Sequence, residues 1–240
     1  MGFMEKETKD YKHVAVLLLG GLGTRFNESK PKQFLPMGGK PLCLYGAEAL
    51  ENSPSVDFIL YVIPDGYMRN FALLLSKAGH KKPSETIIGG KSRQESSKIA
   101  VKYLLRNGFD PSLSVLLQDG DRPNLKERYI QENFENADEY LSSVTAIKAT
   151  DSVAISKEAG LLDGYIPRDE VYLLQTPQAF RLSLLDEAED LADKDGSSYS
   201  DEGSLVLYKK GVQPRIVIGE RANLKITTPE DKNLFERIKG

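Results

Sequence analysis

A glycine-rich segment with two nearby cations contains the residues of this chain best suited to chemistry. It follows an apolar run at 14–19 and comprises Gly20, Gly21, Gly23, Arg25 and Lys32. Glycine has no side chain to keep a phosphate away from backbone N–H groups. Arginine and lysine supply the positive charge that a polyphosphate needs. The segment therefore predicts a binding site for a nucleoside triphosphate.

The same segment does not fit the two commonest phosphate-binding patterns. In the dinucleotide pattern G-x-G-x-x-G, Phe26 stands where the third glycine belongs. The pattern G-x-x-x-x-G-K-[ST] occurs nowhere in the chain. Both mismatches weaken the interpretations as a dehydrogenase and as a P-loop protein. Taken alone, the segment also fits a glycine-rich turn that binds no ligand.

Composition limits the class of protein. A chain of 240 residues fits one α/β domain, and a net charge of −3 provides no general attraction for nucleic acid. The single cysteine, Cys43, excludes an internal disulfide framework. No apolar run approaches the ~20 residues that span a bilayer. Residues 1–12 are charged and lack a signal-peptide core, so we expect a disordered leader on a cytoplasmic protein that binds no membrane.

Strand-like and helix-like segments alternate along the chain. The predicted strands lie at 14–19, 58–63, 86–88, 115–117, 143–147 and 215–218. The predicted helices lie at 41–52, 66–78, 94–107, 125–140, 182–194 and 229–238. This order is typical of an α/β fold with a doubly wound, mostly parallel, Rossmann-like sheet. We predict that residues 13–240 form one such domain.

Four polar loops follow predicted strands. Besides the glycine-rich segment, they are the segments at 89–93, 118–123 and 219–225. Parallel α/β sheets bind ligands beyond the carboxyl ends of their strands, where these loops lie. Their Gly, Arg, Lys and Asp residues therefore predict one shared site.

The segment 148–174 breaks the alternation. Short β-like runs flank a turn that contains Gly160, Asp163 and Gly164, which suggests a hairpin. An isolated two-stranded ribbon is only marginally stable. We therefore predict a homodimer in which this arm packs against a second copy of the chain. The alternative is a hairpin that folds back on its own domain.

Six ordered motifs carry a resemblance to a known family. They are Leu19-Gly20-Gly21-x-Gly23-x-Arg25, Pro31-Lys32-Gln33-Phe34, Gly89-Gly90-x-x-Arg93-x-x-Ser96, Asp119-x-x-Arg122-Pro123, Gln175-Thr176-Pro177-Gln178-x-Phe180 and the run from Asn223 to Asp231. Together they resemble the cytidylyltransferases of the 2-C-methyl-D-erythritol 4-phosphate type over about residues 13–238. Close relatives that act on ribitol 5-phosphate share most of these motifs.

The resemblance implies a direct nucleotidyl transfer. The phosphate of a sugar-alcohol phosphate attacks the α-phosphorus of CTP, Mg²⁺ assists and pyrophosphate leaves. Such catalysis depends on positioning and charge neutralisation rather than on a protein nucleophile.

The resemblance also implies roles for individual residues. The implied catalytic residues are Arg25, Lys32 and Lys225. The implied nucleotide-binding residues are Gly20, Gly21, Gly23, Gly89, Gly90, Arg93, Ser96, Asp119 and Gly120. The implied acceptor-binding residues are Asp119, Arg168, Thr176 and Lys225, and Asp119 is the implied metal ligand.

Each of the charged residues also has a simpler interpretation. Arg25 fits a solvated loop charge, and Arg93 fits a structural anchor of its loop. Asp119 fits a loop hydrogen-bond acceptor, and Arg168 fits a bridge between the hairpin and the domain. If the arm crosses between protomers, Arg168 serves the partner's site.

The chain departs from the family pattern in two places. Where His-Asp-Ala-Ala-Arg-Pro is common, it has Gln118, Gly120 and Asp121. Asp121 adds a carboxylate that fits either a metal ligand or a solvated side chain. Where Asp-Thr-Ile-Lys is common, Ala154 replaces the lysine. These departures keep open the alternative of a nucleotide-binding protein without activity. Leu19-Gly20-Gly21, Pro31-Lys32-Gln33-Phe34 and Tyr172 keep open a second alternative, a ribitol-5-phosphate cytidylyltransferase.

Overall fold

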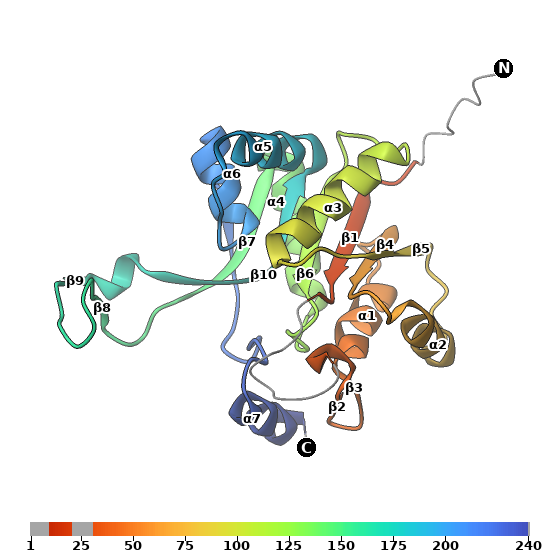
Figure 1. Cartoon of the computed structure of the whole chain (residues 1–240), viewed down its shortest axis with the longest axis horizontal. Helices are drawn as coiled ribbons and strands as arrows, with labels where there is room; N and C mark the ends of the chain where they lie inside the picture. Colours follow the sequence, from red (N-terminus) through yellow and green to blue (C-terminus); the bar gives the residue numbers. More distant parts are fainter. Residues whose placement is uncertain (1–9, 21–30, 240) are drawn as a thin grey trace.

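A seven-stranded sheet forms the centre of the molecule (Figure 1). The computed structural model describes residues 10–20 and 31–239. In spatial order the strands are β11 (Arg215–Ile218), β7 (Ser142–Lys148), β10 (Tyr172–Arg181), β6 (Ser114–Asp119), β1 (His13–Leu18), β4 (Phe58–Ile63) and β5 (Ser84–Ile88). All neighbours are parallel except β10, which is antiparallel to both β6 and β7. The prediction of an α/β fold with a mostly parallel sheet is confirmed.

Helices cover both faces of the sheet. One face packs against α3 (Arg93–Arg106), α5 (Leu182–Asp195) and α6 (Glu202–Lys210). The other packs against α1 (Leu42–Asn52), α2 (Met68–Ala78) and α4 (Glu127–Tyr140). Because successive side chains of a strand point to opposite faces, Val14 and Val16 join the first core, whereas Ala15 and Leu17 join the second. A strand buried on both faces has the unbroken apolar sequence seen in β1.

The predicted strands did not include β10, and the predicted helices at 182–194 and 229–238 left α6 without bounds. Strand β10 contains Gln175-Thr176-Pro177-Gln178, whose polar residues and proline hide the strand pattern. Its pairing with β7 shifts register between Gln175 and Gln178, which accommodates a residue that lacks an N–H donor. Helix α6 begins at an N-cap, Asp201, whose side chain accepts from the backbone N–H of Ser204.

A small third core joins the segment 37–45 to the C-terminal helix. Helix α7 (Pro229–Lys239) lies beside the short strands β2 (Pro36–Met37) and β3 (Lys40–Pro41) (Figure 1). Phe235 of α7 is fully buried among the residues Met37, Leu42, Tyr45 and Ile226. This core fixes the segment that follows the glycine-rich loop, including the 3₁₀ turn η2 (Lys32–Phe34).

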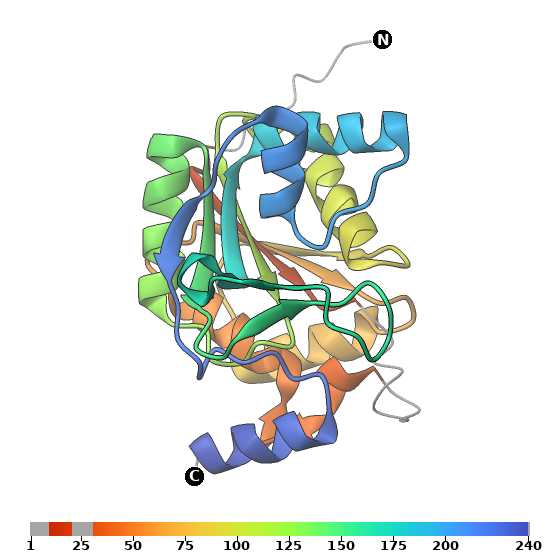
Figure 2. The same cartoon turned by 90° about the vertical axis from the view of Figure 1, so that its left-hand side faces the viewer.

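The arm extends away from the sheet (Figures 1 and 2). Its tip is an antiparallel hairpin of β8 (Val153–Ile155) and β9 (Gly164–Ile166). The predicted arm, 148–174, included residues that belong to the main sheet. There Tyr172, at the start of β10, pairs with Lys148, at the end of β7. The hairpin is therefore shorter than the sequence suggested and is joined to the sheet by the ends of β7 and β10.

Candidate active site

The site lies beyond the carboxyl ends of the parallel strands. Strand β1 leads to Gly20, β5 leads to Gly89, and β6 ends at Asp119. Because β10 runs the opposite way, its first half reaches the same edge. The backbone N–H of Asp119 donates to the hydroxyl of Thr176 at 3.1 Å, which joins β6 to β10 there.

Asp119 is the centre of a charged cluster. Its Oδ1 accepts from Nε of Arg93 at 2.7 Å, and its Oδ2 accepts from Nζ of Lys225 at 2.9 Å. Nε of Arg122 lies 3.9 Å from the same Oδ2. Although burial opposes ionisation, these cations hold the pKa of the Asp119 carboxyl well below its ordinary value. The three cations that surround this carboxylate are groups that can also bind phosphate.

Arg93 forms ion pairs with two carboxylates, those of Asp119 and Glu202. Its Nη1 donates to both carboxylate oxygens of Glu202, at 2.8 and 2.6 Å. Glu202 is only 2% exposed, so the pair is shielded from water. The neighbouring Glu189 is also buried, and burial together with the charge of Glu202 raises its pKa to about 8. Arg93 therefore has the anchoring contacts that we considered for it, and these contacts place it against Asp119.

Lys32 forms a second, separate charge pair. Its Nζ donates to Oδ2 of Asp121 at 2.6 Å and to the carbonyl of Ile226 at 2.7 Å. The Lys32 and Asp121 side chains are 11% and 9% exposed. The N–H of Ile226 donates back to the carbonyl of Asp121 at 2.8 Å. These bonds hold the ammonium group of Lys32 at the same edge of the sheet as Asp119.

Three of the predicted glycines, Gly20, Gly89 and Gly120, lie where a Cβ would be crowded by its neighbours. A Cβ at Gly89 would lie 2.8 Å from Oγ of Ser96, and one at Gly20 would lie 3.2 Å from the same atom. A Cβ at Gly120 would lie 2.2 Å from the side chain of Leu19. Oγ of Ser96 accepts from the N–H of Gly90 at 3.1 Å. Close packing against Ser96 and Leu19 therefore already accounts for these glycines.

Gly21, Gly23 and Arg25 lie outside the described residues. Arg168 is exposed in η3 (Arg168–Glu170) of the arm, where its Nη1 donates to the carbonyl of Thr150 at 3.5 Å. Within one chain, the structure does not bring Arg168 to Asp119.

Sequence reasoning missed the partners that hold the predicted residues. Besides Glu202, they include Asn223, which is fully buried and donates to the carbonyl of Thr176 at 2.9 Å. Arg122 donates to the carbonyl of Asn223 at 2.8 Å. Arg122 and Asn223 stood in the quoted motifs, so their polar types inside a candidate ligand loop were the available signal.

Two cavities flank Asp119. The smaller, of about 60 Å³, is lined by Leu18, Gly20, Gln33, Arg93, Ser96, Asp119, Asp121 and Lys225. The larger, of about 330 Å³, is lined by Arg93, Asp119, Arg122, Leu174, Gln175, Thr176, Gln178, Ser200, Asp201 and Lys225. Lys225 and Arg93 border both, so their charges reach ligands in either cavity.

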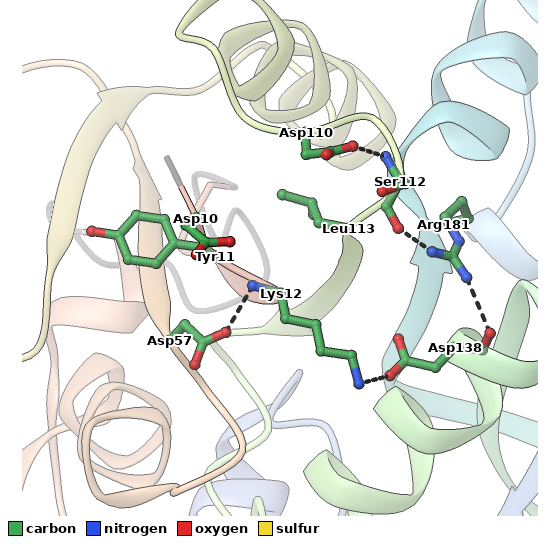
Figure 3. A pocket seen from close by; sticks show the side chains of 9 residues that line it. All are labelled: Asp10, Tyr11, Lys12, Asp57, Asp110, Ser112, Leu113, Asp138 and Arg181. Atoms are coloured by element: carbon green, nitrogen blue, oxygen red, sulfur yellow. Dashed lines mark hydrogen bonds and ion pairs between the residues drawn. The ribbon is translucent and has the colours of Figure 1, made fainter. Parts of the chain in front are cut away.

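A larger hollow, of about 1130 Å³, lies at the amino ends of strands β1 and β6 (Figure 3). Most of its charged side chains already have hydrogen-bond or ion-pair partners in the protein. Nζ of Lys12 lies 2.7 Å from Asp138, and Arg181 donates to the carbonyls of Ser112 and Asp138. These bonds tie the starts of the strands to α4, so we assign this hollow no ligand.

A metal at the site needs ligands from the substrate. Among residues 10–20 and 31–239, no group of three His, Cys, Asp or Glu side chains is arranged to hold an ion. Mg²⁺ usually takes one or two carboxylates together with substrate phosphates, and Asp119 and Asp121 offer such oxygens. In the same part of the chain, no helix is long and apolar enough to cross a membrane.

The fold and this cluster define an α/β nucleotidyltransferase. The family model "2-C-methyl-D-erythritol 4-phosphate cytidylyltransferase" matches residues 13–239. A curated protein of that name from Thermosipho melanesiensis is 36% identical over 231 residues, which cover 95% of this chain and 99% of the relative. One from Bifidobacterium longum is 32% identical, over 94% of this chain and 79% of the relative. The chain therefore belongs to this family, as the motifs had indicated.

Solved structures agree on the fold. The 4-diphosphocytidyl-2C-methyl-D-erythritol synthase of Anaerococcus prevotii superposes with a TM-score of 0.83 at 24% identity, covering 95% of this chain and 96% of that chain. The 2-C-methyl-D-erythritol 4-phosphate cytidylyltransferase of Thermus thermophilus superposes with a TM-score of 0.71 at 26% identity, covering 93% and 96%.

Proposed function

We propose that the protein transfers the cytidylyl group of CTP to 2-C-methyl-D-erythritol 4-phosphate and releases pyrophosphate, a step of isoprenoid precursor synthesis. The observation that carries this function is the cluster of Arg93, Lys225 and Arg122 around Asp119, in a chain that belongs to the cytidylyltransferase family. Ribitol 5-phosphate as the acceptor is not favoured by these comparisons.

The chemistry is a single displacement. An oxygen of the acceptor phosphate forms a bond to the α-phosphorus of CTP, and the bond from that phosphorus to the bridging oxygen of pyrophosphate breaks. Negative charge gathers on the α-phosphate and on the leaving group. We propose that Lys32, Lys225 and Arg25 neutralise this charge, since fixed cations need no rearrangement as the charge develops.

The nucleotide and the acceptor occupy adjacent spaces in this proposal. CTP lies along Gly20, Gly89 and Gly90, and the acceptor enters the larger cavity beside Thr176. Lys225 borders both cavities, which supports its role between the two reacting phosphates.

Mg²⁺ is the proposed cofactor, with Asp119 as a ligand. When bound, the ion would shield charge on the phosphates. Asp119 orients Arg93 and Lys225 through its two oxygens. We also propose a cytoplasmic location, where CTP is available.

The acceptor is tested by supplying CTP, Mg²⁺ and each alcohol phosphate separately. We expect pyrophosphate release with 2-C-methyl-D-erythritol 4-phosphate, with kcat/KM at least about 100-fold above that for ribitol 5-phosphate, since a misplaced acceptor phosphate loses the benefit of positioning. Turnover with ribitol 5-phosphate alone would refute the proposed acceptor. Binding of CTP without turnover of either acceptor would favour the inactive nucleotide-binding alternative.

A homodimer through the arm is the proposed assembly. Large apolar side chains of the arm are exposed in the single chain: Ile155, Leu161, Leu162, Tyr165, Ile166 and Leu173. A second copy would cover them, and Arg168 would then be available to the partner's acceptor site. Exposed apolar patches of this kind mark interaction surfaces.

At micromolar protein concentration, we expect analytical ultracentrifugation to give twice the mass of one chain. Leu162→Asp together with Tyr165→Asp places charge in the proposed interface and should yield monomers with at least about tenfold lower activity. Leu73→Asp, at a comparably exposed leucine of α2, is the matched control and should remain dimeric. A monomeric wild-type protein with full activity would contradict the proposed dimer.

A further inference from the structure

Asp121 carries an enclosed carboxylate oxygen without a hydrogen-bond donor. Its Oδ2 accepts from Lys32, whereas its Oδ1 accepts no hydrogen bond from the described part of the chain. The side chain is nine-tenths buried. Burying a charged oxygen without a partner is unfavourable, so this atom marks a place for a cation.

Asp119 lies next to this oxygen and shares a cation with it. Nζ of Lys225 lies 2.9 Å from Oδ2 of Asp119 and 3.9 Å from Oδ1 of Asp121. One ammonium group therefore stands between two carboxylates. Both aspartates line the same cavity of about 60 Å³, into which the glycine-rich edge opens at Gly20.

The extra carboxylate is unfavourable for a triphosphate by itself. Asp121 adds a second carboxylate to the cavity that Asp119 already lines, and with it a second negative charge. Like charges repel more strongly away from bulk water, and a polyphosphate beside Asp121 would bind less well. A divalent cation between the carboxylate and the phosphates removes this repulsion. Hard cations prefer such oxygens and often combine one or two carboxylates with substrate phosphates.

We propose that Asp121 and Asp119 together form a two-carboxylate site for a divalent cation that enters with the triphosphate. The ammonium of Lys225 holds the place of that cation in the free protein and turns to the phosphates when the cation enters. The proposal rests on the proposed function only in that CTP supplies the remaining ligands.

The test measures metal binding rather than turnover. Mn²⁺ is titrated into the protein with α,β-methylene-CTP, a non-reacting analogue, and free Mn²⁺ is followed by electron paramagnetic resonance. We expect Asp121→Asn and Asp121→Ala to weaken Mn²⁺ binding at least about tenfold. Asp138→Asn, which alters a carboxylate at the opposite edge of the sheet, is the matched control and should leave it unchanged.

Unchanged Mn²⁺ affinity in the Asp121 variants would overturn the proposal. Tighter analogue binding with unchanged Mn²⁺ affinity would overturn it too, because Asp121 would then act only as the counter-ion of Lys32. No acceptor is present, so the outcome is separate from the proposed function. Weakened Mn²⁺ binding in a protein that fails to use 2-C-methyl-D-erythritol 4-phosphate would overturn the function and leave the metal site standing.

A second variant tests the place held by the ammonium group. Lys225→Met removes the positive charge and keeps most of the length of the side chain. Without nucleotide, we expect this variant to bind Mn²⁺ at least about tenfold more tightly than wild type, since the ammonium group that contacts both carboxylates is gone. Adding Asp121→Asn to it should abolish the gain. Equal Mn²⁺ affinity of wild type and Lys225→Met would contradict the proposed exchange.

Discussion

Lys32→Ala is expected to lower kcat by about 10²–10³-fold, the range found when one preorganised charge-stabilising group is removed from an active site. CTP affinity should fall by a much smaller factor, because several other cations still contact the phosphates. The measurement is steady-state kinetics with 2-C-methyl-D-erythritol 4-phosphate, together with equilibrium binding of CTP. A kcat within a few-fold of wild type would remove Lys32 from the catalytic role.

The structure adds a control for this variant. Lys32→Ala leaves Asp121 buried without its cation, and the loss of one partner of a buried pair costs about 3–5 kcal/mol. The variant is therefore also expected to be less stable. Lys32→Ala combined with Asp121→Ala removes both charges and should recover most of the free energy of unfolding without recovering kcat. Recovery of kcat in the double variant would show that the single variant had failed through instability alone.

Asp119→Asn is expected to damage both stability and turnover. The asparagine keeps the shape but loses the charge that Arg93 and Lys225 contact at 2.7 and 2.9 Å. Removing one partner of such a buried network costs about 3–5 kcal/mol. For a chain of this size that is on the order of 10 °C in Tm. We expect kcat/KM to fall by at least about 100-fold, since both cations lose their common anchor.

The pH dependence of unfolding distinguishes this role from simple packing. The folded pKa of Asp119 is held below its unfolded value of about 3.9. Its stabilising contribution is therefore fully present above that value and is lost as the pH falls through the folded pKa. The difference in unfolding free energy between wild type and Asp119→Asn should be constant from pH 5 to 8 and narrow below about pH 4. A difference that does not change with pH would contradict an ionised Asp119.

The sequence predicted the elements that obey a simple period. Strand β1 is an unbroken apolar run. Helix α3 is preceded by its N-cap, Ser92, whose side chain accepts a hydrogen bond from the backbone N–H of Glu95. Both elements could therefore be placed from local residues. Strand β10 could not, because Gln175-Thr176-Pro177-Gln178 has neither alternation nor an apolar run. Its place is fixed by pairing with β6 and β7, which are distant along the chain.

The site was predictable as a set of loops but not as a set of contacts. The polar residues after the strands of a parallel sheet converge for topological reasons, and Asp119, Arg93 and Lys225 do meet. The partner Glu202 was missed because its acidic first-turn position in a helix had a sufficient local explanation. Its bond to Arg93 depends on how α6 packs beside α3, which is a tertiary property.

The most direct test of the central claim uses CTP in which sulfur replaces one non-bridging oxygen of the α-phosphate, so that the α-phosphorus is a chiral centre of known configuration. A single displacement by the acceptor phosphate, with Lys32 and Lys225 acting only as cations, predicts inversion of configuration at that phosphorus in the product formed with 2-C-methyl-D-erythritol 4-phosphate. Retention would require two displacements through a covalent nucleotidyl-enzyme, and it would contradict the account.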